Sequence, residues 1–116
     1  MQLQLVSPER VLVDEKVDEV QVPGLSGYMG VLPGHAPLLS ELMPGGVLTY
    51  KAGGSEKVIA VFGGFVEVSD DRVRVLADAA ERKEDINVEQ ARAELSKATD
   101  PAEIARAQAK IDAASK

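Results

Sequence analysis

The sequence predicts an all-β sandwich of about ten short antiparallel strands, followed by an antiparallel α-helical hairpin. From Met1 to about Ala80, short apolar runs alternate with polar residues and are separated by turns that contain glycine or proline. Beyond Arg82, apolar residues recur every three or four positions and glycine disappears. We therefore place a β-sandwich domain at residues 1–82 and a two-helix hairpin at residues 83–116.

Alternation with a period of two residues indicates the strands of the first half. Residues 2–5 alternate polar and apolar side chains, and residues 17–22 place Val20 and Val22 on the same face. The segment Lys51–Ser55 predicts a β-hairpin that joins residues 47–50 to residues 57–62. Further turns are predicted at Pro23-Gly24, Pro44-Gly45-Gly46 and Ser69-Asp70-Asp71.

The last third predicts two helices that are too weak to stand alone. Asn87 is suited to cap the first helix, and Asp100-Pro101 followed by Glu103 is suited to begin the second. Half of the residues in the two apolar stripes are alanines, and short isolated helices are marginal in water. We expect the hairpin to pack on the sandwich or on another subunit. The stripes are Val88, Ala91, Leu95 and Ala98 in the first helix and Ile104, Ala107, Ile111 and Ala114 in the second.

Composition excludes several classes of function. The net charge of −6 and the aromatic content of 3% disfavour a nucleic-acid partner. The chain lacks cysteine, so it has neither disulfides nor thiolate metal sites. Its single histidine, His35, has no serine or cysteine nearby in the sequence to form a nucleophile and base pair. No apolar run approaches the roughly 18 residues that span a bilayer, so we expect a soluble, non-catalytic protein without a metal site.

The segment from Gly27 to Leu42 is the strongest candidate for a binding site. Its glycines and prolines force the chain to turn sharply while it carries apolar side chains. These side chains either fill one end of the core or contact a partner. The histidine in this segment either contacts the partner or forms a hydrogen bond across the turn. The candidate partner-binding residues are Tyr28, Met29, Val31, His35, Leu38 and Leu39.

The same segment carries a resemblance to a known family. Residues 27–38 read Gly-Tyr-Met-Gly-Val-Leu-Pro-Gly-His-Ala-Pro-Leu. This stretch resembles a motif of the epsilon subunit of the F-type ATP synthase, which is equivalent to the mitochondrial delta subunit. Four shorter matches occur in the same order along the chain: Ser7–Arg10, Val22–Gly24, Gly63–Val68 and Val75–Ala80.

The resemblance implies a function that composition alone does not. It implies a non-catalytic rotor subunit of the central stalk, linking the gamma shaft to the c ring of a proton-translocating enzyme. It further implies that the hairpin regulates ATP hydrolysis by contacting the alpha and beta subunits. The implied location is the cytoplasmic face of the bacterial plasma membrane, as a peripheral part of the complex with no cofactor for catalysis.

An alternative is a stand-alone ATP-binding sensor domain. Some bacterial members of the family bind regulatory ATP through an Ile or Leu-Asp-x-x-Arg-Ala signature at the start of the first helix. Here Arg92 and Ala93 match, whereas Val88 and Glu89 depart from the pattern, and Arg106 could add a phosphate contact. Glu89 and Arg92 also fit an ordinary surface ion pair at i, i+3, so both interpretations stay open.

Overall fold

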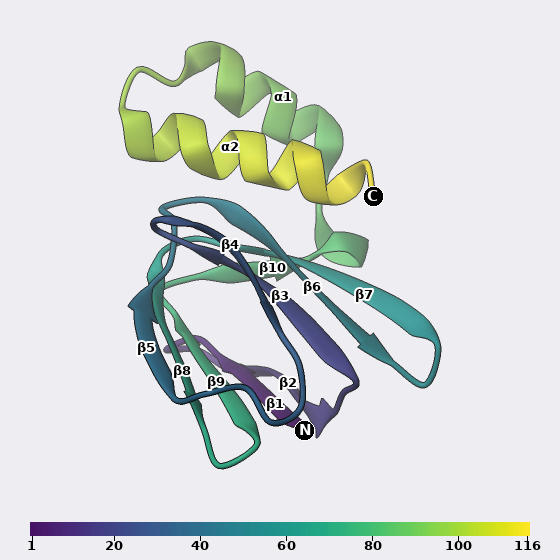
Figure 1. Ribbon diagram of the computed structural model, residues 1–116. Coiled ribbons are helices and arrows are strands. Elements are labelled where there is room, and N and C mark those ends of the chain that lie inside the picture. Colours follow the sequence, from purple (N-terminus) through teal and green to yellow (C-terminus); the bar gives the residue numbers. More distant parts are fainter.

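The computed structural model describes residues 1–116 as two five-stranded sheets and a helical hairpin (Figure 1). Sheet A has the strand order β2-β1-β9-β8-β5, and sheet B has the order β10-β7-β6-β3-β4. The strands are β1 Gln2–Val6, β2 Val11–Lys16, β3 Glu19–Gly24, β4 Gly27–Val31, β5 Leu38–Glu41, β6 Gly46–Ala52, β7 Ser55–Val61, β8 Gly64–Ser69, β9 Arg72–Ala77 and β10 Ala80–Arg82. The predicted fold class is confirmed.

One strand pair departs from the expected antiparallel pattern. β1 runs antiparallel to β2 but parallel to β9, with Leu3 opposite Val73 and Leu5 opposite Val75. The first strand is thus inserted between β2 and a strand that lies about seventy residues later in the chain. The N-terminal strand therefore joins β2 to the rest of sheet A and ties the two ends of the sandwich sequence together.

The core lies between the two sheets. On β1, Leu3 and Leu5 are fully buried while their polar neighbours face outward, as period-two alternation requires. Val66 on β8 and Leu48 on β6 add fully buried side chains from sheet A and sheet B respectively. We call the cluster of seventeen buried residues between the sheets the main core. Its dense aliphatic packing makes the sandwich a rigid body.

One of the turns predicted from the sequence forms where expected, and another is displaced. Gly53 and Gly54 both adopt positive φ, 59° and 86°, in the tight turn between β6 and β7, as predicted. The turn predicted at Pro23-Gly24 lies two residues later, at Leu25-Ser26, because β3 continues through Gly24. Pairing of β3 with β6 ends at Gln21, so no β6 partner requires the missing N–H of Pro23.

A short 3-10 helix, η1 (Lys83–Asp85), follows the sandwich and leads into α1 (Val88–Lys97) and α2 (Pro101–Ala114). The Asn87 side chain accepts a hydrogen bond from the Gln90 N–H at 3.1 Å, as predicted for the first cap. The Asp100 side chain accepts one from the Ala102 N–H, also at 3.1 Å. The Glu103 side chain accepts no hydrogen bond from the Asp100 N–H, so the second half of a capping box does not form. Neither helix is long and apolar enough to cross a bilayer.

The hairpin covers the outer face of sheet B, with α2 between α1 and the strands (Figure 1). The face of α2 that contacts the sheet is an alanine stripe, Ala109 and Ala113, which the sequence analysis did not single out. On the stripe that we did predict, Ala107 is buried, but Ile104 is 40% exposed. The small side chains of Ala109 and Ala113 let the helix approach the strands closely. Both this face and the predicted face of α2 therefore contain buried alanines.

Candidate interaction surfaces

The segment from Gly27 to Leu42 forms β4, an exposed loop at residues 32–37, and β5. The His35 N–H donates to the Leu32 carbonyl at 3.1 Å and closes the loop. Nδ1 of His35 lies 2.6 Å from the Ala36 carbonyl oxygen, which fits an Nδ1–H donor. The Gly34 N–H donates to Asp71 in the β8–β9 turn at 3.4 Å, so the loop is attached to sheet A. Leu32, at 56% exposure, is the large apolar side chain of this loop.

The six candidate partner-binding residues do not form one surface. Tyr28 is half exposed on the outer face of sheet B, where its hydroxyl accepts a hydrogen bond from the Val47 N–H at 3.0 Å. Leu39 is 70% exposed and lies on the outer face of sheet A, on the other side of the sandwich. His35 lies in the exposed loop between these strands.

Three of the six point inward. Val31 is fully buried and belongs to the main core, so naming it as a partner contact is corrected. Met29 and Leu38 are partly buried and pack against the same core. Strand alternation explains this result, because Tyr28 and Leu39 lie next to inward-facing neighbours in β4 and β5. The segment thus fills the core and offers an exposed loop at the same time.

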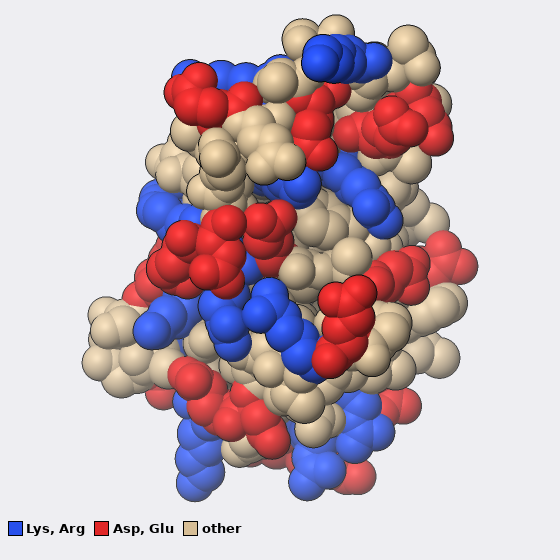
Figure 2. All heavy atoms as spheres, turned by 180° about the vertical axis from the view of Figure 1, so that it is seen from behind, with Lys and Arg blue, Asp and Glu red and all other residues tan.

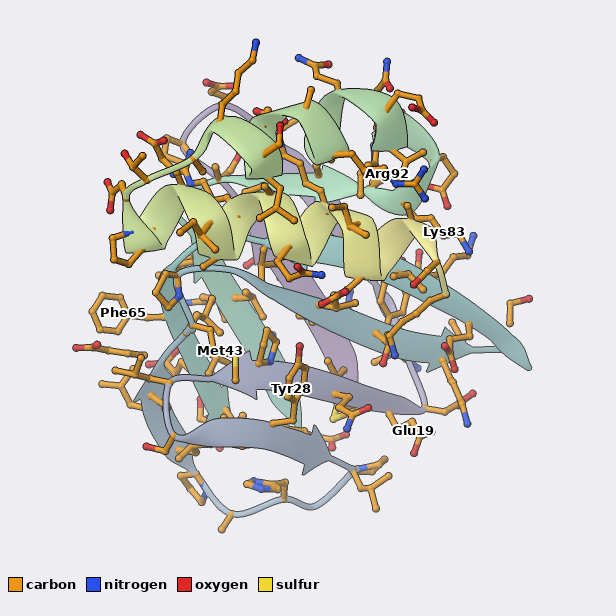
Figure 3. All side chains as sticks on the ribbon, turned by 90° about the horizontal axis from the view of Figure 1, so that it is seen from above. Glu19, Tyr28, Met43, Phe65, Lys83 and Arg92 are labelled. Carbon is orange, nitrogen blue, oxygen red and sulfur yellow. The ribbon has the colours of Figure 1, made fainter.

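A second exposed apolar surface was not singled out from the sequence. Val11, Val6, Leu76 and Phe65 are successive register partners across β2, β1, β9 and β8, and we call them the apolar row. Three of them are about half exposed: Val11 at 56%, Phe65 at 49% and Leu76 at 48%. Phe65 projects from the margin of the molecule in Figure 3, on the opposite side of the view from Arg92. The signal for Phe65 was present in β8, where Val66 and Val68 face inward and therefore turn Phe65 outward.

Charged side chains border the apolar row on the same face. In the neighbouring register positions, Gln4 lies between Asp14 and Arg74, and Arg74 lies opposite Glu67. Nη1 of Arg74 is 3.9 Å from Glu67, while its buried Nε has no hydrogen-bond partner. Figure 2 shows that Lys and Arg side chains are interspersed with Asp and Glu over the rear of the molecule. The apolar row is therefore a platform with polar groups of both signs beside it.

A pocket of about 500 Å³ lies between the hairpin and the sandwich. Phe62 forms its aromatic wall, and Arg106 and Lys110 place their cationic groups 5.5 and 5.8 Å from the centre of the ring. Glu81 and Glu94 also line the pocket, so cations and carboxylates occur together. This charge balance makes the pocket a poor match for a polyphosphate, which needs a surplus of donors.

The candidate nucleotide-binding residues are not brought together. Arg92 lies 3.6 Å from Glu89 within α1, as the simple ion-pair interpretation requires, and both side chains are largely exposed. Arg106 lines the pocket against Phe62, to which neither Glu89 nor Arg92 contributes. The structure contains no group of three or more acidic or histidine side chains arranged to hold a metal ion.

Comparisons with known proteins agree with this architecture of a two-sheet sandwich and a short hairpin. Residues 1–83 match the family model described as ATP synthase, Delta/Epsilon chain, beta-sandwich domain. The ATP synthase epsilon chain of Solibacter usitatus is 56% identical over 97 residues, covering 84% of this chain and 72% of the relative. The epsilon chain of Nitratidesulfovibrio vulgaris is 47% identical over 114 residues, covering 97% of this chain and 81% of that one.

A solved structure gives the same result. A chain of the Euglena gracilis mitochondrial ATP synthase, determined with OSCP, F1 and c-ring, has a TM-score of 0.67 and 29% identity. The match covers 94% of this chain and 72% of the Euglena chain. A chain of the Tetrahymena thermophila enzyme, with a TM-score of 0.64 and 14% identity, shares the fold. The protein belongs to the ATP synthase delta/epsilon chain family.

Proposed function

We propose that this protein is a non-catalytic central-stalk subunit of a proton-translocating F-type ATP synthase, linking the gamma shaft to the c ring. The match of residues 1–83 to the delta/epsilon sandwich family carries this proposal. Relatives named ATP synthase epsilon chain, such as those at 56% and 47% identity, support it. In this role the chain transmits torque and performs no chemistry, so a rigid body with broad contact surfaces is required in place of an active-site cleft.

The apolar row is the surface that we assign to the gamma shaft. It crosses four strands of sheet A, which are held from beneath by the main core. Exposed apolar patches rimmed by polar groups are typical of protein interfaces, and phenylalanine is enriched at their centres. A row of side chains fixed to a sheet loses little conformational entropy on binding, which favours a firm grip.

The loop at residues 32–37, together with Leu39, is the surface that we assign to the c ring. The loop lies at the end of the sandwich opposite α1 and α2, and Leu32 and Leu39 are its most exposed apolar side chains. His35 adds a polar contact beside them. Tyr28 faces the hairpin side of the sandwich instead, so it is not included in this surface.

We further propose that residues 1–82 and 83–116 act as two domains, the second regulating ATP hydrolysis through contacts with the alpha and beta subunits. The complex containing this chain would lie on the cytoplasmic face of the bacterial plasma membrane, with this subunit peripheral to the bilayer. The rival role, a stand-alone ATP sensor, is not favoured, because Arg106 lies in a different cluster from Glu89 and Arg92.

Co-purification tests the proposal. The chain is co-expressed with a gamma subunit and a c ring, and stoichiometric recovery of all three is the expected result. Phe65→Asp should weaken capture of gamma about 30-fold or more, the effect typical of an interface hot spot. Leu39→Asp should instead reduce recovery of the c ring. Ile104→Asp, at an exposed apolar position of α2, is the matched control.

The outcomes separate the parts of the proposal. Failure of the wild-type chain to form any complex with gamma would contradict the central-stalk role. Stoichiometric capture of gamma by the Phe65→Asp variant would show that the apolar row is not the shaft surface. Thermal unfolding of each isolated variant must match the wild type, because these side chains are exposed and their replacement leaves the main core intact.

A further inference from the structure

The hairpin is joined to the sandwich by a single ion pair and by no hydrogen bond. Nζ of Lys110 on α2 lies 3.8 Å from Oε1 of Glu81 on β10. The same ammonium lies 3.3 Å from Oε1 of Glu94 on α1. One lysine therefore connects both helices to the sandwich, and its side chain is only 22% exposed.

Phe62 completes the surroundings of this lysine. The Lys110 ammonium lies 5.8 Å from the centre of the Phe62 ring, and the Arg106 guanidinium lies 5.5 Å from it. Both distances are within the range of a cation–π attraction. Phe62 follows β7 directly, so the two cations of α2 hold the helix to the end of a strand that is itself part of sheet B.

The remaining contact is a small apolar seam that is separate from the main core. On the sandwich side it contains Val47, Val58 and Phe62, and on α2 it contains Ala109 and Ala113. None of these residues belongs to the cluster between the sheets. Removing α2 from sheet B would therefore expose the seam without opening the main core.

Gly45 sets how closely the helix can approach. A Cβ atom at this position would lie 2.3 Å from the Ala105 carbonyl oxygen of α2, far inside the contact distance. The neighbouring atom is backbone, so it cannot turn aside. The docked position of α2 thus requires glycine at residue 45. The three nearest atoms to such a Cβ all belong to α2, so the helix, and not the strands, imposes this requirement.

We propose that Lys110 is a latch, whose contacts with Glu81, Glu94 and Phe62 set how firmly the hairpin is held on the sandwich. Glu81 is the sandwich half of the latch, and Glu94 of α1 contacts the same ammonium. The alanine seam and the fit at Gly45 make docking specific but weak. The latch controls whether the hairpin is free to contact other subunits. Its regulatory role therefore rests on the function proposed above.

Hydrogen exchange of the isolated full-length chain tests the latch. In Lys110→Met, α2 amides should exchange about tenfold faster than in wild type, corresponding to about 1.4 kcal/mol, while β1, β8 and β9 stay unchanged. Arg92→Met is the matched control, because Arg92 pairs only with Glu89 inside α1. Lys110→Arg keeps the charge and should restore exchange to within about twofold of wild type. Equal exchange in Lys110→Met and Arg92→Met, or equal acceleration in the sandwich strands, would overturn the proposal.

Ionic strength gives a second measure of the same contact. Raising salt to about 1 M shortens the screening distance to about 3 Å and should speed exchange of α2 in the wild-type chain. Lys110→Met should lose most of this salt response, because it lacks the charge that is screened. A salt response of equal size in both proteins would contradict an ionic latch.

Gly45→Ala tests the docked geometry without changing any charge. We expect it to release α2 more fully than Lys110→Met, because the added methyl group collides with the helix backbone. Gly30→Ala is the control, because a Cβ there meets nothing within 4 Å. If α2 in Gly45→Ala stays as protected as in Gly30→Ala, the close fit does not govern docking.

ATP hydrolysis by the assembled enzyme separates the latch from the proposed function. A changed rate with Lys110→Met, at unchanged subunit recovery, supports control of the hairpin by the latch. An unchanged rate, together with faster exchange of α2 in the isolated chain, would leave the latch standing and contradict the regulatory role of the hairpin. The two failures are therefore distinguishable.

Discussion

The main core and the seam under α2 differ in the size of the side chains that build them. Between the sheets, leucines and valines from eight strands interdigitate, together with Ile59 and Tyr50, and residues such as Leu3, Leu5 and Leu48 are fully buried. Under α2, two alanines meet three larger side chains of sheet B. Strand β6 takes part in both, because Leu48 faces the main core and Val47 faces the seam.

This difference shows how one small chain can combine a rigid sandwich with a hairpin that is only weakly attached to it. Burying a large aliphatic side chain contributes about 1.5 to 3 kcal/mol, whereas each buried methyl-sized group contributes about 0.8 kcal/mol. The sandwich is therefore held by many large buried side chains, whereas the hairpin is held by three large side chains of the sandwich, two alanines of α2 and Lys110. Rigidity suits the transmission of torque, and a weak seam suits a helix pair that changes position.

The largest expected effect comes from cutting a cavity in the main core. Leu48→Ala should lower the free energy of unfolding by about 3 kcal/mol, because the buried site cannot collapse completely. Val47→Ala, one residue earlier on the opposite face, should cost about 1.5 kcal/mol. Urea unfolding of both variants measures the difference. Equal losses would show that seam and core are equally important for stability.

Removing the hairpin should have a smaller effect. A chain that ends at Glu84 should keep a folded sandwich with cooperative unfolding and lose about 2 kcal/mol, because the conformational entropy of ordering the two helices offsets most of what burial under α2 contributes. The loss comes from Val47, Val58 and Phe62, which α2 no longer covers. Urea unfolding and amide NMR spectra measure it. An unfolded fragment would mean that the sandwich depends on its hairpin.

Loss of the second helix cap should be felt in α2 alone. Asp100→Ala removes the acceptor for the Ala102 N–H and should cost about 1 kcal/mol of helix stability. Hydrogen exchange in α2 should accelerate while the sandwich strands keep their rates. Asp112→Ala, near the other end of the helix, is the control and should be close to neutral, because removing a charge that opposes the helix dipole offsets the loss of the hydrogen bond from Gln108. Faster exchange throughout the sandwich would show that α2 and the strands unfold together.

The smallest effect concerns alkaline pH. Burial raises the pKa of the Tyr50 hydroxyl above its ordinary value of 10.0, and the nearby Glu15 carboxylate raises it further. The folded chain then holds this proton more tightly than the unfolded chain, so stability falls as pH rises above about 10. Tyr50→Phe should reduce this fall when urea unfolding is compared at pH 8 and pH 10.5. A fall of unchanged size would exclude Tyr50 as its source.

Part of the alkaline fall should remain in that variant. The hydrogen bond and charge of Glu19 raise the pKa of the exposed Lys51 ammonium above its ordinary value of 10.5. This contribution is present below that value and is lost as pH rises through the raised pKa. Lys51→Met in the Tyr50→Phe background isolates it.

Local signals predicted much of the fold. The β6–β7 hairpin, the caps at Asn87 and Asp100, and the start of α2 at Pro101 were all read correctly, because each depends on residues close together in the chain. The turn at Pro23-Gly24 was misjudged, because proline is acceptable in a strand wherever the neighbouring strand does not use its N–H. That condition is set by β6, which begins at Gly46, 23 residues after Pro23 (46 − 23).

The candidate surfaces were predicted less completely, for a related reason. Alternation tells which residues share a face, but not whether that face is covered. Val31 and Leu39 are both apolar residues near the same loop, yet one is fully buried and the other is 70% exposed. The apolar row consists of side chains from four separate strands, and only the register of sheet A aligns them.

By itself the sequence determined the division into a β half and a helical half, most of the turns, the caps and the family. These depend on periodicity, on backbone preferences of single residues and on short motifs, all of which act over a few positions. Only the tertiary structure decided that the alanine face of α2 meets sheet B and that Lys110 reaches Glu81. Contacts of this kind join segments distant in the chain, and an alanine or a lysine looks the same in sequence whether it is buried, paired or exposed.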